Sequence, residues 1–315
     1  MRLGVLLWPQ RTTWGSFRDA ALAAEHAGAD ALWTWDHLMA IVGPWDEPIL
    51  EGWSLLAGLA EATDRAKLGL LVAANTFRNP GLTAKLATTL DQMSDGRAIL
   101  GLGGAWFERE HDGFGLDFGH GVGERLDRLD EATMLIRRLL DGERVTHRGG
   151  YYQVHDAVCA PRPIQDRLPI MIGGSGPQKT LRTTARYADQ WNLFGNLNDA
   201  IERNRVLDER CAEVGREPSA IERTIAKSIV LRDDAAEARA VFEAGLRGHG
   251  VEDPSASIAI TGPPAAVAAE LRPYLDAGFE QVIVALREPF DRETIDRLPE
   301  LVAAVDATEP AEARK

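Results

Sequence analysis

The segment KLGLLVAANTFRNPGLTAKLATTLDQMSDGRAILGLGG, residues 67–104, decides the fold. Residues 68–74 form an almost wholly apolar run, which is typical of a parallel strand covered on both faces. Asn79-Pro80 then supplies a helix cap and a first helical residue, and apolar side chains follow at helical spacing. A second apolar run covers residues 98–102. The segment therefore predicts a strand, a crossover helix and a second parallel strand.

The same alternation of strands and helices continues along the chain. Further strands are predicted at residues 3–8, 31–35, 170–172, 190–194, 223–231, 258–260 and 281–286, and helices at 16–27, 53–63, 123–140, 178–187, 198–214, 234–246 and 265–276. About eight strands alternating with helices favour a closed (β/α)8 TIM barrel over an open sheet. β-prone runs around Gly149-Gly150 predict a hairpin insertion near residues 144–155. We expect a single barrel domain over residues 1–305 and a charged, frayed tail over residues 306–315.

Composition and charge narrow the class of protein. The 315 residues carry a formal net charge of −13, which argues against nucleic acid or an anionic membrane as a partner. The two cysteines, Cys159 and Cys211, are too few for a disulfide framework and fit a reducing cytosol. No run reaches the ~18 apolar residues of a membrane span. A cytoplasmic protein is therefore predicted.

Polar and small residues follow four of the predicted strands. Ligands bind at the carboxyl ends of parallel strands in α/β folds, so the residues at these positions are the candidate site. They are Asp36 and His37 after the second strand, Asn75 after the third, Gly103 and Gly104 after the fourth, and Gly173, Gly174, Ser175 and Gly176 after the fifth.

His37 is the first catalytic candidate, because imidazole can donate or accept a proton near neutral pH. A lone histidine more often has a structural role, and both interpretations stay open. Asp36 would orient His37 or bind a ligand. Asn75 offers an amide for a ligand or for a local turn.

The glycines also have two interpretations. Small residues at the start of a helix let backbone N–H groups approach a phosphate, and the 173–176 segment has this character, although it could equally form a tight turn. Gly103 and Gly104 either form a turn or leave room for a flat ring. The spacing is not that of a dinucleotide-binding GxGxxG motif.

Two other groups of side chains have chemistry that bears on ligand binding. His111, Asp112 and His120 lack metal-ligand spacing, so no metal site is predicted. Tryptophans near the predicted strand ends suggest an organic substrate with a planar or hydrophobic part; they are Trp8, Trp35, Trp45, Trp53, Trp106 and Trp191.

Five motifs together resemble the bacterial luciferase-like (β/α)8 flavoenzymes, and within them the branch that uses the deazaflavin coenzyme F420. They are WTWDH (33–37), NTFRNP (75–80), SDGRAILGLGGAWFEREHDGFG (94–115), GERVTHRGGYYQV (142–154) and PIMIGGSGPQKTLRTTARYADQWN (169–192). The resemblance covers nearly the whole chain in order and spacing. It implies a barrel that holds a flavin or deazaflavin at the carboxyl ends of its strands, in a homodimer.

The resemblance also assigns roles to the candidate residues. Leu71 and Val72 match a non-prolyl cis peptide that forms a bulge against the ring face. Asp36 and His37 match an acidic or serine residue followed by a histidine beside the cofactor. Asn75 would bind the ring edge, Gly103 and Gly104 would lie against the ring, and residues 173–176 would bind the phosphate.

Three functions follow as hypotheses. The first is an F420-dependent oxidoreductase that moves a hydride between the deazaflavin and a small organic substrate. The second is an FMN-dependent monooxygenase that uses O2, and the third is a non-catalytic flavin-binding barrel. Trp106 occupies the position matched to a glutamate of the sugar-phosphate dehydrogenases in this branch, which argues against sugar-phosphate oxidation.

Overall fold

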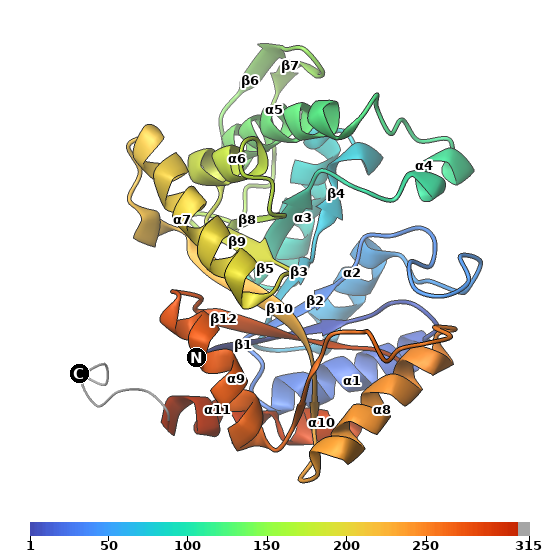
Figure 1. Cartoon of the computed structure of the whole chain (residues 1–315). Coiled ribbons are helices and arrows are strands. Elements are labelled where there is room, and N and C mark those ends of the chain that lie inside the picture. The colour runs from blue at the N-terminus through green and yellow to red at the C-terminus, as the bar shows by residue number, and fades with distance from the viewer. Residues whose placement is uncertain (308–315) are drawn as a thin grey trace.

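A closed barrel of eight parallel strands forms the centre of the molecule (Figure 1). The computed structural model describes residues 1–307. Each barrel strand pairs in parallel with its two neighbours, and β9 pairs with β10 to complete the ring. In order around the barrel, the strands are β1 (Arg2–Leu7), β2 (Ala31–Thr34), β3 (Lys67–Leu70), β5 (Ala98–Gly103), β8 (Ile170–Gly173), β9 (Gln190–Leu193), β10 (Glu222–Leu231) and β12 (Gln281–Leu286). The predicted (β/α)8 barrel is confirmed.

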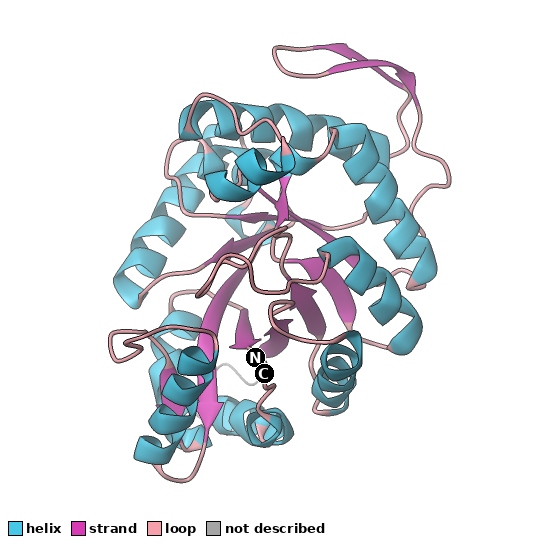
Figure 2. Cartoon of the chain, turned by 90° about the vertical axis from the view of Figure 1, so that its right-hand side faces the viewer, coloured by secondary structure: helices cyan, strands magenta, loops and turns pink. Residues whose placement is uncertain are grey.

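Helices surround the barrel, as Figures 1 and 2 show. Side chains between strands and helices form the larger apolar cluster, and a second cluster that includes Leu6, Trp33, Ile99 and Met171 fills the barrel. The helices that follow barrel strands are α1 (Trp14–His26), α2 (Gly52–Ala62), α3 (Pro80–Met93), α5 (Val122–Leu140), α6 (Thr180–Tyr187), α7 (Leu197–Glu213), α8 (Ala235–Gly248), α9 (Pro264–Asp276), α10 (Arg292–Asp296) and α11 (Leu298–Ala307).

Local sequence explains where several helices begin. Asn79 accepts a hydrogen bond from Gly81 N–H, and Pro80 is the first residue of α3, as predicted. Thr13, Asn196 and Asp234 cap α1, α7 and α8 in the same way. The predicted hairpin is also present as β6 (Val145–Arg148) and β7 (Gln153–Ala157), and it projects from the barrel in Figure 2.

The structure corrects the predicted elements at four places. The strand predicted at 68–74 is interrupted after Leu70 and resumes as β4 (Ala73–Ala74). The loop after β5 contains a helix that was not predicted, α4 (Glu108–Phe114), and two further helices that were not predicted, α10 and α11, follow β12. The strand near residue 260, β11 (Ile260–Gly262), pairs only with β10 and lies outside the barrel. Residues 306 and 307 belong to α11, and 308–315 lie outside the described residues.

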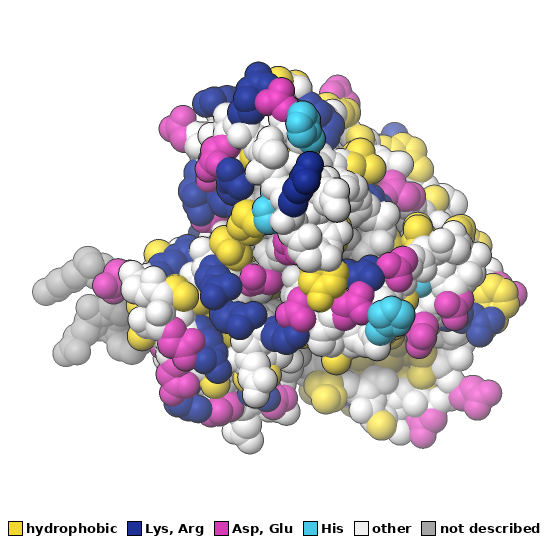
Figure 3. All heavy atoms as spheres, turned by 90° about the horizontal axis from the view of Figure 1, so that it is seen from above, with side chains coloured by type: hydrophobic (Ala, Val, Ile, Leu, Met, Phe, Trp, Pro, Cys, Tyr) yellow, Lys and Arg dark blue, Asp and Glu magenta, His cyan; other side chains and the backbone are white. Residues whose placement is uncertain are grey.

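Charged side chains of both signs are interspersed on the face that carries the hairpin (Figure 3). Hydrophobic side chains appear there as separate spots between them. In the part of the chain that the structure describes, no helix is long and apolar enough to cross a membrane.

Candidate active site

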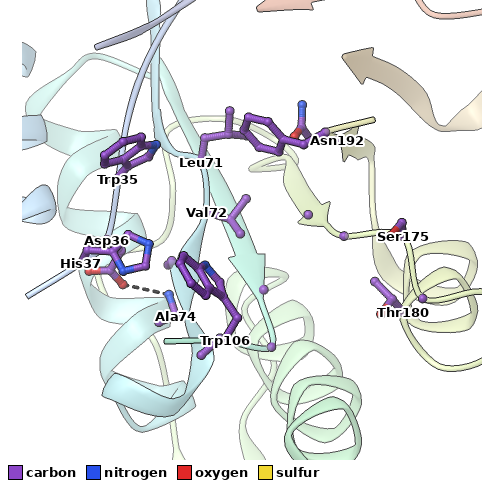
Figure 4. A pocket seen from close by; sticks show the side chains of 18 of the residues that line it. Trp35, Asp36, His37, Leu71, Val72, Ala74, Trp106, Ser175, Thr180 and Asn192 are labelled. Carbon is purple, nitrogen blue, oxygen red and sulfur yellow. Dashed lines mark hydrogen bonds between the residues drawn. The ribbon is translucent and has the colours of Figure 1, made fainter. Parts of the chain in front are cut away.

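A cavity of about 580 Å³ lies at the carboxyl ends of the barrel strands (Figure 4). We call it the first cavity. Its walls come from the segments that follow β2, β3, β5 and β8, which are far apart in sequence. Of the eleven candidate residues, all but Asn75 line it: Asp36, His37, Leu71, Val72, Gly103, Gly104, Gly173, Gly174, Ser175 and Gly176.

Val72 forms one wall of the first cavity. The Leu71–Val72 peptide bond is cis, as the resemblance implied, and it interrupts the strand between β3 and β4. The Val72 side chain packs where side chains of the neighbouring strands would otherwise lie. A Cβ atom on Gly103 would lie 2.6 Å from Val72 Cγ2, and one on Gly173 would lie 2.9 Å from the same atom. These glycines are therefore needed for the bulge to fit.

Gly104 has a different neighbour. A Cβ atom there would lie 2.9 Å from Leu126 Cδ2, so this glycine lets α5 approach the end of β5. Both Gly103 and Gly104 line the first cavity, but the close contacts that exclude side chains are with the protein itself.

Asp36 is a buried carboxylate at the end of β2. It makes a two-pronged ion pair with Arg78, at 2.6 and 2.9 Å, and accepts a hydrogen bond from Ala74 N–H at 2.9 Å. Burial raises the pKa of Asp36, and Arg78 and the Ala74 N–H oppose that rise. Arg78 also donates to Glu51, the N-cap of α2, at 3.2 Å. The expectation that Asp36 orients His37 is wrong, because no hydrogen bond joins the two side chains and His37 Nδ1 is paired with Glu110.

His37 is held by Glu110 instead. His37 Nδ1 lies 2.9 Å from Glu110 Oε1, and the other carboxylate oxygen accepts a hydrogen bond from Leu38 N–H at 2.8 Å. A carboxylate only accepts hydrogen bonds, so Nδ1 carries the proton. This leaves Nε2, which has no hydrogen-bond partner among the described residues, as the exchangeable nitrogen. His37 also packs edge-on against Trp106, with ring centroids 5.6 Å apart.

Glu110 was missed by the sequence analysis because it lies on α4, which was not predicted. It is 1% exposed, although its neighbours Glu108 and Arg109 are exposed. The helix is anchored by His111, which contacts Phe107 O through Nδ1 and Thr76 Oγ1 through Nε2. Two acidic residues in the first turn of α4 would have indicated a helix start.

The segment after β8 presents backbone N–H groups without hydrogen-bond partners among the described residues. Gly174 has φ +129°, a conformation that favours glycine, and a Cβ atom on Gly176 would lie 2.7 Å from Thr180 Oγ1. Within residues 1–307, no hydrogen bond is formed by the N–H groups of Ser175 and Gly176. Ser175 and Gly176 lie five and four residues before Thr180, the first residue of α6, and the N-terminal end of a helix favours a negative charge.

Asn75 lies beside the cavity but does not line it. It is buried, and its Nδ2 donates to Tyr152 Oη at 3.1 Å, so the amide links the end of β4 to the β6–β7 hairpin. Across residues 1–307, no cluster of three or more His, Cys, Asp or Glu side chains has the arrangement of a metal site.

The fold and this cavity define a TIM-barrel protein with a cofactor-sized site at the carboxyl ends of its strands. The sequence profile of the luciferase-like monooxygenase family matches residues 1–304. The chain belongs to that family.

Individual relatives agree with this membership. The chain is 31% identical over 312 residues to an F420-dependent glucose-6-phosphate dehydrogenase of Kineococcus radiotolerans, covering 90% of each chain. It is 31% identical over 273 residues to a phthiodiolone/phenolphthiodiolone dimycocerosates ketoreductase of Mycobacterium tuberculosis, covering 75% of this chain and 70% of that one. The coenzyme F420-dependent tetrahydromethanopterin reductase of Methanopyrus kandleri has the same fold, with a TM-score of 0.79 at 22% identity over 96% of this chain and 98% of that one.

Proposed function

We propose that the protein is an F420-dependent oxidoreductase that transfers a hydride between the deazaflavin and an organic substrate. The observation that carries the proposal is the His37–Glu110 pair at the edge of the first cavity, in a chain 31% identical over nine tenths of its length to an F420-dependent dehydrogenase. An acid-base residue beside a cavity of cofactor size is what hydride transfer to or from an alcohol or carbonyl carbon requires.

The residues of the first cavity fit the cofactor. The free N–H groups of Ser175 and Gly176 would bind its phosphate, and Val72, Gly103 and Gly104 would bound the flat ring. Asp36 would face the ring from the end of β2. When bound, the deazaflavin supplies a carbon that donates or accepts a hydride.

His37 accepts or donates the proton that the substrate exchanges when the hydride is transferred. Because Glu110 fixes the proton on Nδ1, neutral His37 presents the Nε2 lone pair as a base for a substrate hydroxyl. In the reverse direction the protonated imidazole of His37 donates a proton from Nε2 to a carbonyl oxygen of the substrate. Glu110 stabilises the imidazolium form of His37 in both directions of the reaction.

Parallel titration of the protein with F420 and FMN tests the proposal. Trp35 and Trp106 line the first cavity, so their fluorescence reports on ligand binding there. We expect saturable quenching by F420 and weaker quenching by FMN. No binding of F420 at all would contradict the proposal.

A second candidate function is FMN-dependent monooxygenation, which the name of the family favours. Reduced FMN reacts with O2, whereas a reduced deazaflavin reacts poorly with it. Oxygen uptake with reduced FMN and a substrate panel would support this candidate. Tight flavin binding without redox exchange across the panel would support a non-catalytic binding barrel.

We also propose that the protein is a cytoplasmic homodimer. Leu82 and Met93 of α3 are 51% and 39% exposed, which supports an interface on this helix. Cys159 and Cys211 are unpaired and buried, as in proteins of a reducing compartment. Light scattering coupled to size exclusion tests the dimer, and a monomeric mass would contradict it.

A further inference from the structure

A second cavity, of about 660 Å³, adjoins the first at the mouth of the barrel. The two share Trp35 and Phe194 in their walls. A volume of this size is typical of a site for a small organic ligand. The second cavity also contains Trp8, Ile258 and Ile260.

The unequal lengths of β9 and β10 create this cavity. The two strands pair only from Glu222 to Ile225 on β10, and β9 ends at Leu193. β10 continues to Leu231, pairing with β12 and then with β11. The cavity is lined by the residues just past this divergence, Phe194 and Gly195 on one side and Ala226 to Ser228 on the other.

Large hydrophobic side chains are exposed around both cavities. Phe194 is 59% exposed and Ile258 is 83% exposed at the second cavity, and Trp106 and Val122, each 62% exposed, line the first. Apolar surface of this extent around a concave site marks a place where an apolar ligand is buried. A purely polar ligand would leave it in contact with water.

The charges of the two cavities point to the same class of ligand. The first cavity is lined by Glu110 and by Asp36, whose charge is balanced by Arg78 behind it, and by no Lys or Arg within the described part of the chain. The second contains Asp199 and Glu270 together with one cation, Lys227.

Two of the three N–H donors of Lys227 are already used by the protein. Its Nζ donates to Gly195 O and to Tyr274 Oη, and burial lowers the pKa of its ammonium group. In the second cavity, a phosphate dianion on a substrate would therefore lie near Asp199 and Glu270 with at most one N–H of Lys227 to bind it, which is unfavourable.

We infer that the substrate is an uncharged alcohol or ketone with an extended apolar chain, which lies across Trp35 and Phe194 into the second cavity, and that it is not a sugar phosphate. This inference rests on the proposed function for its alcohol or ketone group. It separates this chain from the glucose-6-phosphate dehydrogenase that it resembles in sequence.

A homologous series of ketones tests the inference. We would measure the binding of 2-butanone, 2-hexanone and 2-octanone, and of glucose 6-phosphate, by calorimetry on the F420-loaded protein. Each buried CH2 is expected to tighten binding by roughly two- to fourfold. Equal affinities along the series, or tighter binding of glucose 6-phosphate than of 2-octanone, would overturn the inference.

A matched pair of variants tests whether the apolar part of the ketone lies in the second cavity. Ile258→Asp places a carboxylate in the second cavity, and Ile201→Asp makes the same change at a 50% exposed position of α7 that lines neither cavity. We expect Ile258→Asp to weaken 2-octanone binding about tenfold, in keeping with the loss of several buried CH2 contacts. Ile201→Asp should leave it unchanged, and equal effects of the two variants would overturn the assignment of the cavity.

Separate titration of F420 distinguishes the two possible failures. If F420 binds and the ketone series is flat, the substrate class is wrong and the proposed function stands. If F420 does not bind, the proposed function fails, and the ketone series on the protein alone then decides whether the second cavity takes an apolar chain.

Discussion

His37 Nδ1 and Glu110 Oε1 lie 2.9 Å apart although 73 positions separate the two residues in the chain. The contact joins the segment after β2 to the helix that follows β5. It fixes the imidazole tautomer at the edge of the first cavity, and it makes Glu110 a positioning residue for His37.

Replacing His37 tests the acid-base assignment. The His37→Asn variant should lose ~10²- to 10⁴-fold in turnover with F420, because no group would exchange the proton of the substrate. F420 binding, measured by fluorescence, should be retained. The exposed His120 offers a control, and turnover of His37→Asn equal to that of His120→Asn would contradict the assignment.

Glu110→Gln tests the positioning role. His37 Nδ1 and Leu38 N–H donate to different oxygens of Glu110, and in glutamine one of these positions becomes an NH2 group, so one donor loses its acceptor. We expect turnover to fall roughly 10- to 10³-fold, less than for His37→Asn, and the free energy of unfolding to fall by ~1–3 kcal/mol. F420 affinity should not change.

Glu108→Gln is the matched control for this change, since Glu108 is exposed on the same helix. A variant of Glu110 with normal turnover but reduced stability would show that the residue only holds α4 in place. Steady-state kinetics and urea denaturation on the same preparations separate the two roles.

Gly103→Ala tests the packing of the bulge. The added methyl group would lie 2.6 Å from Val72 Cγ2, so Val72 must move into the first cavity or β5 must shift. We expect a loss of ~1–3 kcal/mol in stability, together with weaker F420 binding.

Gly123→Ala is the comparison for this variant. Gly123 lies in α5, and its added Cβ would approach no atom more closely than Lys179 Nζ, at 3.8 Å. Alanine in a helix should leave stability unchanged or raise it by up to ~1 kcal/mol. A Gly103→Ala protein as stable as Gly123→Ala would refute the packing argument.

The N-cap residue Glu51 leads to a prediction about how the stability of the fold depends on pH. Burial by itself raises its pKa, but hydrogen bonds from Ser54 and Trp53 and the charge of Arg78 lower the pKa overall. A carboxyl group whose pKa is lower in the folded state stabilises the fold above its unfolded pKa, and the stabilisation is lost as pH falls through the folded value.

Glu51→Gln should therefore cost about 1 kcal/mol at pH 7 and progressively less below pH ~4.3. Denaturant unfolding at several pH values measures this difference. The exposed Glu61→Gln serves as control, and a cost for Glu51→Gln that stays constant down to pH 3 would contradict the prediction.

The barrel was predictable because its strands are continuous apolar runs separated by helices with clear caps. Asn79-Pro80 shows this best, since a side-chain acceptor and a proline at adjacent positions define a helix start by local chemistry alone. Helix α4 lacks a side-chain N-cap, and the two acidic residues of its first turn are its one local signal. Its sequence EREHDGF has no apolar periodicity, and its position depends on the contact between His111 and Thr76, which lie far apart in the chain.

The strand ends that form the candidate site could be predicted from the sequence, but the partner of each side chain in the site could not. Asp36 and His37 are adjacent, which suggested that one orients the other. In the structure Asp36 binds Arg78, 42 residues away, and His37 binds Glu110. Adjacent residues at a strand end point in different directions, so their partners depend on the packing of other loops.

The early departure of β10 from β9 also affects how related sequences can differ. The eight-strand register depends on the pairing at Glu222 to Ile225, whereas Phe194 to Asn196 lie beyond it in a loop. Insertions or deletions in this loop would change the length of substrate that fits without altering any barrel hydrogen bond. Comparing loop lengths at this position should therefore sort members of the family by the size of molecule they accept, independently of overall sequence identity.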